Sequence, residues 1–298
     1  MVKKKTTKGI VIAAYGRAGY GYAAFNLFRS IRYYNSEVPV TLLYDNVIEN
    51  NLEELADFES KIKLNENLIY HNGKIDPAKV KFEMYDLLPY DENLILDADN
   101  IAFKDLGKLI DKLSEMKKDF ICQYVHCGKK SDGIDYMWAS NEDTWTYFDL
   151  KEDDQYCTMQ SSVLFVRKNA KTEKLYNGFK AYFYKGFYGK SLKKWGGTLA
   201  DEFIIGGVLA KNKIDASCGF KIDFLGHRDW DLELTEIQDK HWMLALYGQG
   251  IGTNRLTKDQ YIHWADRIMQ EINTAFNAPN KYKMAFIMRD KHVNFLQK

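Results

Sequence analysis

Two aspartates stand two residues apart at the end of an apolar run. The run Leu94–Leu96 is typical of a buried strand, and Asp97 and Asp99 follow it with Ala98 between them. Burying a carboxylate is costly unless a positive partner compensates it. In an extended segment, residues two apart point to the same side, so both carboxylates would address one Mn²⁺ or Mg²⁺ ion, and Ala98 would leave room for its ligand. The structural alternative is that Asp99 or Asn100 caps a following helix while Asp97 enters a salt bridge.

The elements that would position this pair alternate between strand and helix. Such alternation indicates βαβ units and a mostly parallel sheet, in which ligands bind outside the carboxyl ends of the strands. Asp97 and Asp99 lie at one such end. The expected strands are Gly9–Tyr15, Val38–Tyr44, Asn93–Leu96, Phe120–Tyr124 and Ser161–Arg167, and the expected helices are Tyr22–Tyr34, Leu52–Phe58, Val80–Leu88, Leu106–Met116, Thr172–Lys185, Leu199–Lys211 and a helix beyond His263.

Composition limits the class of protein. The 298 residues include 42 Lys and Arg against 41 Asp and Glu, so a net charge of +1 provides no global field that would attract nucleic acid. The four cysteines lack CxxC spacing, which predicts neither a zinc site nor a disulfide framework and favours a reducing compartment. The basic start, MVKKKTTKG, precedes no apolar stretch long enough for a signal peptide or membrane span, so we expect a cytoplasmic protein.

The stretch KFEMYDLLPYDENLILDADNIAFKDL, residues Lys81–Leu106, resembles the core of glycosyltransferase family 8, the glycogenin-like and lipooligosaccharide galactosyltransferase-like enzymes. The shared features are a basic residue opening a helix, LLPYD, and an apolar strand leading into LDAD. Further stretches resemble the family in the same order. They are GIVIAAYGRAGYGYAAFNLFRSIR, QSSVLFVRKNAKTEKLY (Gln160–Tyr176), LADEFIIGGVLAKN (Leu199–Asn212) and QYIHWADR (Gln260–Arg267).

The resemblance implies an α/β protein with the GT-A fold, a single domain whose Rossmann-like, mostly parallel mixed sheet is flanked by helices. The expected organisation is a basic tail over residues 1–8, a glycosyltransferase domain over 9–270, and a helical, basic and aromatic extension over 271–298. Within the domain, we expect a donor-binding half at 9–125 and an acceptor-binding, catalytic half at 126–270.

The resemblance also implies an activity. Family members transfer a hexose from a nucleotide diphosphate sugar, here most simply a UDP-sugar, with retention at the anomeric carbon. Carried over, Asp97, Asp99 and His263 would hold the Mn²⁺ or Mg²⁺ that stabilises the leaving diphosphate. The alternative for His263 is a half-buried structural histidine.

Several residues would bind the nucleotide sugar. Lys81 would contact the donor phosphate or sugar as a point charge, although lysines on helices are usually solvated. Arg267 would supply a positive charge to the diphosphate, and Gln160 replaces the family's asparagine at the donor sugar. The remaining candidates are Ala13, Ala14, Tyr15 and Tyr20 for the base or ribose, Asp45 for either of these, and Ala98 between the aspartates.

The most informative departure from the family lies at Asp201 and Glu202, because the family usually has glutamine where Glu202 stands. A carboxylate near the anomeric carbon can stabilise an oxocarbenium-like centre or attack it. We therefore expect Glu202 to be catalytic and Asp201 to hold donor-sugar hydroxyls. The alternative is that an acidic pair simply opens a helix, where the dipole favours it.

Other readings stay open at this point. Gly19-Tyr20-Gly21 with Ala24 matches the GxGxxA fingerprint of an NAD-dependent Rossmann oxidoreductase, with Asp45 near the ribose-binding distance. A non-catalytic nucleotide-sugar binder is a further alternative. The acceptor is undetermined between glycan, glycolipid and a modified DNA base, because the lysine- and aromatic-rich stretches Ala181–Trp195 and Lys281–Lys298 suit peripheral membrane contact, base stacking or a solvated surface. The sequence does not determine the oligomeric state.

Overall fold

The protein is described by a computed structural model, which divides the chain into two compact units of interleaved segments. Unit 1 comprises residues 1–7, 65–93 and 116–220, and unit 2 comprises 8–64, 94–115 and 221–298. The structure describes residues 7–34, 37–135, 138–186, 199–225, 234–246 and 255–282, with the backbone alone at 224–225 and 255–263.

A mixed six-stranded sheet with helices around it confirms the expected α/β class. The strand order is β3-β2-β1-β6-β9-β8. The pairs β1–β2 and β2–β3 are parallel, whereas β8 and β9 are antiparallel. The strands of this sheet are β1 (Lys8–Ala14), β2 (Val40–Tyr44), β3 (Ser60–Lys63), β6 (Glu92–Asp97), β8 (Phe120–Gly128) and β9 (Tyr156–Arg167).

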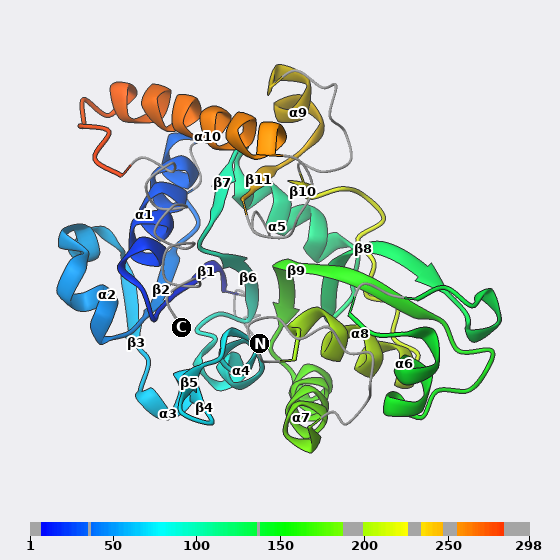
Figure 1. Cartoon of the computed structure of the whole chain (residues 1–298). Helices are drawn as coiled ribbons and strands as arrows, with labels where there is room; N and C mark the ends of the chain where they lie inside the picture. Colours follow the sequence, from blue (N-terminus) through cyan, green and yellow to red (C-terminus); the bar gives the residue numbers. More distant parts are fainter. Residues whose placement is uncertain are drawn as a thin grey trace, which may run out of the picture. The chain divides into compact units, whose positions relative to one another are not determined.

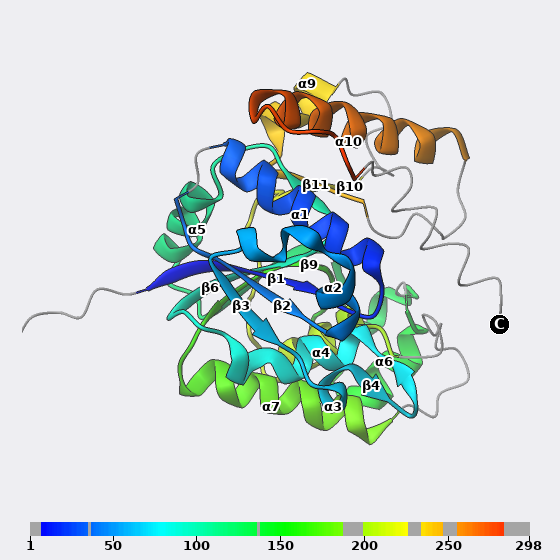
Figure 2. The same cartoon turned by 90° about the vertical axis from the view of Figure 1, so that its left-hand side faces the viewer.

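Unit 2 contains the parallel strands (Figure 2). β1 and β2 are buried along nearly their whole length, which is typical of parallel strands covered on both faces. Gly21 lets the first helix approach the second, because a Cβ there would lie 3.1 Å from a methyl of Ile48. The other elements of unit 2 are α1 (Ala18–Tyr33), α2 (Asn46–Asn51), the 3₁₀ helix η1 (Glu53–Asp57), β7 (Asn100–Ala102), α5 (Leu106–Glu115), β10 (Asp223–Leu225), α9 (Leu234–Lys240), β11 (Met243–Ala245) and α10 (Arg255–Ala275).

Unit 1 is built around the antiparallel β8–β9 pair, against which α8 packs (Figure 1). Gly206 and Gly207 in the middle of α8 make this close packing possible. A Cβ on Gly206 would lie 2.6 Å from the carbonyl oxygen of Cys157, and one on Gly207 would lie 2.1 Å from the ring of Phe148. The other elements of unit 1 are α3 (Glu66–Ile69), β4 (Tyr70–His71), β5 (Lys74–Ile75), α4 (Pro77–Glu83), η2 (Met84–Leu87), η3 (Lys130–Asp132), α6 (Asn141–Phe148), α7 (Ala170–Lys185) and α8 (Asp201–Lys211).

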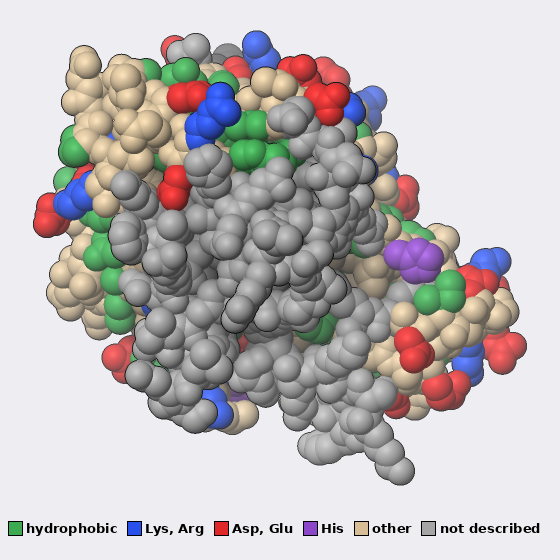
Figure 3. Space-filling model, turned by 45° about the horizontal axis from the view of Figure 1, so that its top comes forward, with side chains coloured by type: hydrophobic (Ala, Val, Ile, Leu, Met, Phe, Trp, Pro, Cys, Tyr) green, Lys and Arg blue, Asp and Glu red, His purple; other side chains and the backbone are tan. Residues whose placement is uncertain are grey.

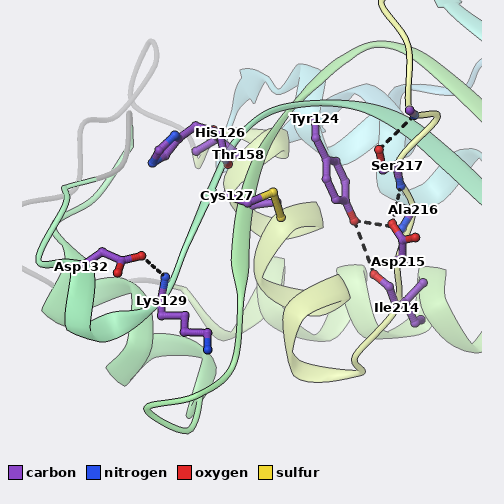
Figure 4. The surroundings of a disulfide bond; sticks show 12 residues. Tyr124, His126, Cys127, Lys129, Asp132, Thr158, Ile214, Asp215, Ala216 and Ser217 are labelled. Atoms are coloured by element: carbon purple, nitrogen blue, oxygen red, sulfur yellow. Dashed lines mark hydrogen bonds between the residues drawn. A yellow bond between two sulfur atoms is a disulfide. The ribbon is translucent and has the colours of Figure 1, made fainter.

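The expectation of no disulfide is wrong. Cys127 on β8 and Cys157 on β9 pair directly opposite each other and form a disulfide across the two strands (Figure 4). They are 30 residues apart in sequence, so only the strand pairing brings them together. The other two cysteines, Cys122 and Cys218, are buried free thiols.

Other differences concern local structure. The expected helix at Leu52–Phe58 is the short 3₁₀ helix η1, and α2 before it was missed. The sequence pattern also missed α6 and the small sheet of β10, β11 and β7, whose strands have only three residues each. The expected loop at Lys190–Thr198 and most of the basic tail beyond Tyr282 lie outside the described residues. Among the residues that were described, no helix is both long and apolar enough to cross a bilayer.

Candidate active site

Lys81 joins two segments of unit 1 that are far apart in sequence. Asp76 and Pro77 fix the start of α4, since the Asp76 carboxylate accepts the N–H of Ala78 at 3.1 Å and proline suits the first helical turn. Lys81 stands in the last turn of this helix. Its ammonium donates to the carbonyl oxygen of Ser161 at 3.1 Å and to its hydroxyl oxygen at 3.0 Å, and pairs with the Asp201 carboxylate at 2.8 Å.

Ser161 can make these contacts because β9 is irregular at that point. The pairing of β8 with β9 passes from Cys122–Leu164 to Gln123–Gln160, so residues 161–163 have no partner on β8. Bulges of this kind re-aim side chains and free backbone groups. The carbonyl of Ser161 is thereby available to Lys81.

Asp201 opens α8, where the helix dipole favours a carboxylate. Burial opposes its ionisation, but the charge of Lys81 and the hydrogen bonds from Lys81 and Ser161 outweigh it. The pKa of Asp201 therefore lies below its ordinary value of 3.8. The side chains of Lys81 and Asp201 are only 12% and 20% exposed, so this is a largely buried ion pair with an ionised carboxylate at neutral pH.

Glu202 is the next residue of α8 and is held by a different segment. Its carboxylate accepts the indole N–H of Trp138 at 2.8 Å. Glu202 is buried and Trp138 is half-buried. The two neighbouring carboxylates at the head of α8 therefore have different partners, a lysine for Asp201 and an indole for Glu202.

Gln160 lies beside this cluster on β9, immediately before Ser161. It is only 4% exposed, and its side-chain oxygen has no hydrogen-bond partner among the described residues. A buried amide oxygen is costly to leave unsatisfied. Gln160 thus has an acceptor available for a ligand hydroxyl or N–H.

In unit 2, the aspartate pair lies in the turn between β6 and β7. Asp97 ends β6, and Ala98 and Asp99 form the turn. The expectation that both aspartates belong to one extended segment is therefore wrong. The capping alternative is also wrong, because a strand and not a helix begins at Asn100. Asn100 donates to the carbonyl oxygen of Asp97 at 2.9 Å, and the carbonyl of Asp99 accepts the N–H of Leu246 at 3.0 Å. These bonds fix the backbone of the turn.

Asp45 follows β2 and links two strand ends of unit 2. One carboxylate oxygen accepts the N–H of Ile48 at 3.0 Å and so caps α2, and the other accepts the N–H of Gly16 at 2.8 Å. Gly16 has a φ of 78°, a conformation that glycine adopts without strain. Asp45 therefore holds the turn after β1, which ends at Ala14, and its expected contact with a nucleotide remains a prediction.

The remaining expected residues of unit 2 lie on helices or beside β1. Tyr20 is in the first turn of α1, and Ala13 and Ala14 are the last two residues of β1, directly before Tyr15. His263 is in α10, but its side chain lies outside the described part of the structure. Arg267 is 65% exposed on the same helix and pairs with Glu271 at 3.5 Å.

Two candidate metal ligands of unit 2 lie in the turn of the aspartate pair. Asp97 and Asp99 supply carboxylate oxygens from a single turn, which suits Mn²⁺ or Mg²⁺. Over the residues whose side chains are described, no three His, Cys, Asp or Glu side chains gather as a metal-binding group. Two carboxylates fit such an ion, because Mg²⁺ is commonly bound by one or two carboxylates together with substrate phosphates.

Sequence reasoning missed two residues of the cluster. Ser161 was expected only as the first residue of a strand, and nothing in the sequence singled out Trp138. A bulge leaves no periodic pattern, and nothing in the sequence near Trp138 indicates a contact with a helix that begins at residue 201. The signals for the site in the sequence were the Asp201–Glu202 pair and the stretches with Lys81 and Gln160 that resemble the family.

Comparisons with solved structures identify the fold. The WbbM bifunctional glycosyltransferase superposes with a TM-score of 0.53 at 12% identity, over 92% of this chain and 52% of its own. The galactosyltransferase LgtC, in complex with donor and acceptor sugar analogues, gives 0.53 at 12% identity, over 86% of this chain and 95% of its own. The glycosyltransferase GlyE of Streptococcus pneumoniae TIGR4 gives 0.51 at 14% identity, over 92% and 66%. The chain thus spans half to two thirds of WbbM and GlyE.

These neighbours are GT-A glycosyltransferases, so the expected GT-A fold is confirmed. At such low identity the likeness establishes the fold alone. No family model matches the sequence, and no curated protein matches it.

Proposed function

We propose that this chain is a metal-dependent glycosyltransferase that moves a hexose from a nucleotide diphosphate sugar, a UDP-sugar, to an acceptor hydroxyl with retention. The observation that carries the proposal is the cluster at the head of α8. Lys81 and Ser161 hold Asp201 there, and Glu202 follows it directly. In a fold shared with glycosyltransferases, an ionised carboxylate beside a second carboxylate is suited to glycosidic chemistry.

Asp201 would orient the donor sugar. Its pKa is lowered by Lys81, so it is an acceptor for sugar hydroxyls at any pH near neutral. Lys81 has three N–H donors, and the oxygens of Ser161 and Asp201 provide three acceptors for them. Contact between Lys81 and the donor would require one of these bonds to be exchanged, which favours a role in holding Asp201.

Glu202 would act at the anomeric carbon. Its carboxylate either stabilises the positive charge that develops there or attacks to form a glycosyl-enzyme. One of the structural neighbours is an active-site mutant of LgtC in which glutamine is replaced by glutamate. Glu202 is the residue that stands where the family resemblance implies a glutamine. Intact-mass measurement after mixing with donor would detect a hexose adduct on Glu202 if it attacks, and an unmodified mass would favour front-face displacement.

Unit 2 would bind the nucleotide diphosphate. Asp97 and Asp99, with His263, would hold Mn²⁺ or Mg²⁺, which when bound stabilises negative charge on the leaving diphosphate. Ala98 leaves space between the two carboxylates. The other proposed contacts are Ala13, Ala14, Tyr15, Tyr20 and Asp45 for the nucleoside, Gln160 for the sugar and Arg267 for the diphosphate.

The acceptor is proposed to be a glycan hydroxyl. Figure 3 shows acidic and basic side chains intermixed over the described part of one face, and no basic patch suited to DNA gathers among them there. A glycolipid or a modified DNA base would be distinguished by offering each as acceptor. We further propose a cytoplasmic location; the disulfide weighs against it, and cell fractionation with thiol trapping tests it.

The oxidoreductase alternative loses support from the position of its fingerprint. Gly19 and Gly21 lie inside α1, which begins at Ala18, and not in the turn after β1. Gly21 serves packing against Ile48. Asp45, the expected ribose ligand, caps α2.

The test is a panel of UDP-, GDP- and CDP-sugars, with and without Mn²⁺, using wild type and Asp99→Asn. A ligand that binds only the folded protein raises its unfolding midpoint. The expected result is a Mn²⁺-dependent shift with one UDP-sugar, lost in the mutant, together with release of UDP and an α-configured product. A shift with NADH and none with any sugar nucleotide would replace this function by the oxidoreductase.

A further inference from the structure

Trp138 belongs to a segment that leaves the sheet after Gly128 and returns to it at Tyr156, one residue beyond each of the two disulfide cysteines. Between these two cysteines the chain forms η3, passes through Trp138 and forms α6 before entering β9. Trp138 is the residue of this segment that donates to Glu202. The disulfide therefore closes the loop that carries the partner of Glu202.

The two halves of this segment are held differently. The second half packs firmly, because Phe148 of α6 lies against Gly207 of α8 and the indole of Trp145 donates to the carbonyl of Lys151 at 2.9 Å. The first half, residues 129–135, is mainly exposed. Among the few described bonds between residues 129–135 and α6, the N–H of Asn141 donates to the carboxylate of Asp135 at 2.9 Å.

The stretch of β8–β9 pairing that directly precedes residues 129–135 is short. Val125 bulges out of β8, and three residue pairs follow it, of which Cys127–Cys157 is the middle one. Figure 4 shows the disulfide beside His126 and Thr158, whose hydroxyl donates to the His126 carbonyl at 3.3 Å. Because this pairing is so short, the disulfide fixes the point at which the exposed residues 129–135 begin.

The disulfide is also placed against α8, and a reductant would reach it from the side of Cys127, because Cys157 is only 8% exposed. The carbonyl oxygen of Cys157 would lie 2.6 Å from a Cβ on Gly206. Gly206 is one turn after Glu202 on α8. Cys157 lines a cleft of about 290 Å³ with Tyr124 and Asp215 on its wall, and Cys127 is half-buried. The free thiol of Cys122 does not compete, because burial raises its pKa and keeps it protonated.

We propose that Trp138 is a positioning residue for Glu202, and that the Cys127–Cys157 disulfide makes this positioning depend on redox state. The role of Glu202 in transfer rests on the proposed function. In the oxidised protein the closed loop holds the indole N–H on the Glu202 carboxylate. A dithiol breaks the S–S bond by giving up two electrons and two protons, becomes a disulfide itself and leaves two cysteine thiols. The loop then opens at its base and the Trp138–Glu202 hydrogen bond weakens.

Indole ¹⁵N–¹H NMR tests this without any need for activity. The signal of Trp138 is assigned by its disappearance in Trp138→Phe. We expect it to shift in Glu202→Gln and on addition of dithiothreitol, while the signal of Trp145, which bonds a backbone carbonyl in the same segment, stays in place. In the double variant Cys127→Ser, Cys157→Ser, the Trp138 signal should have the chemical shift of the reduced protein and should not change when dithiothreitol is added. A Trp138 signal unmoved by Glu202→Gln or by dithiothreitol overturns the proposal.

Kinetics test the positioning role. A hydrogen bond to a charged group accounts for about tenfold in rate, so Trp138→Phe should lower kcat about tenfold while KM for the donor changes less than about twofold. Trp138→His, which retains an N–H donor, should recover part of the loss. An equal kcat in Trp138→Phe and wild type overturns the proposal. If wild type transfers no sugar while the NMR shifts occur as expected, the proposed function fails and the link from the disulfide to Glu202 stands.

Discussion

The two units place their carboxylates in contrasting surroundings. In unit 1, Asp201 and Glu202 are bound by side chains from other elements, Lys81 and Trp138. In unit 2, the described bonds around Asp97 and Asp99 fix the backbone of their turn, and those at Asp45 come from backbone N–H groups. The comparison indicates that side chains from distant segments hold the carboxylates of Asp201 and Glu202, whereas backbone hydrogen bonds hold the turn that carries Asp97 and Asp99.

The largest effect should come from the aspartate pair. Asp99→Asn removes the charge of a proposed metal ligand and keeps the size of the side chain, so we expect transfer to fall about a thousandfold, roughly 4 kcal/mol of transition-state stabilisation. In the absence of metal, Asp99→Asn should lower the unfolding midpoint of the protein less than Lys81→Met does. Steady-state kinetics with a Mn²⁺ titration and thermal unfolding measure both quantities. Unchanged transfer with a large loss of stability would show that the aspartate pair is structural.

The second effect concerns the buried ion pair. Lys81→Met leaves the Asp201 carboxylate without its charge partner, and we expect a loss of about 3 kcal/mol in the free energy of unfolding near neutral pH. The folded-state pKa of Asp201 lies below 3.8, so the stabilisation is complete above that pH and disappears as the pH falls through the folded value. Denaturant unfolding of both proteins at about pH 7 and about pH 3 should show the difference shrinking on acidification. Lys180→Met, at the partly exposed and longer 3.9 Å pair with Glu83, is the matched control.

The third effect compares the same substitution in both units. Gly207→Ala in α8 places a Cβ 2.1 Å from the ring of Phe148, which is fully buried, so we expect overpacking to cost about 2 kcal/mol. Gly21→Ala in α1 meets methyl groups of Ile48 at 3.1 and 3.2 Å and the Cβ of Leu52 at 3.6 Å, and the higher helix propensity of alanine offsets these contacts. Urea unfolding of the two variants measures the contrast. A loss at Gly21 as large as that at Gly207 would mean that the units are packed equally tightly there.

The smallest effect is expected at Asp45. Asp45→Ala removes the cap of α2 and should cost about 1 kcal/mol in the free energy of unfolding. Asp45→Asn keeps an oxygen for one of the two N–H groups and should cost less. If nucleotide affinity falls together with stability in Asp45→Asn, Asp45 also contacts the ligand.

Much of the fold followed from the sequence, because its strands and long helices are local patterns. Buried parallel strands appear as apolar runs, and β1, β2 and β6 were found within two residues of their bounds. Helices with an apolar face, such as α5 and α7, were found in the same way. The Asp201–Glu202 pair at the head of α8 was also visible, since two acidic residues before an apolar run are typical of a helix start.

Tertiary structure alone decided what these residues contact. The bulge in β9 that presents Ser161 to Lys81, the indole of Trp138 on Glu202, and the opposite positions of Cys127 and Cys157 all depend on pairing between distant segments. The turn at Asp97–Asp99 was expected to be extended, because no local pattern in the sequence marks the residue at which a strand stops pairing. Sequence fixes the periodicity and chemical type of each residue, whereas the partner of a buried charge is set by which backbones meet in the folded chain.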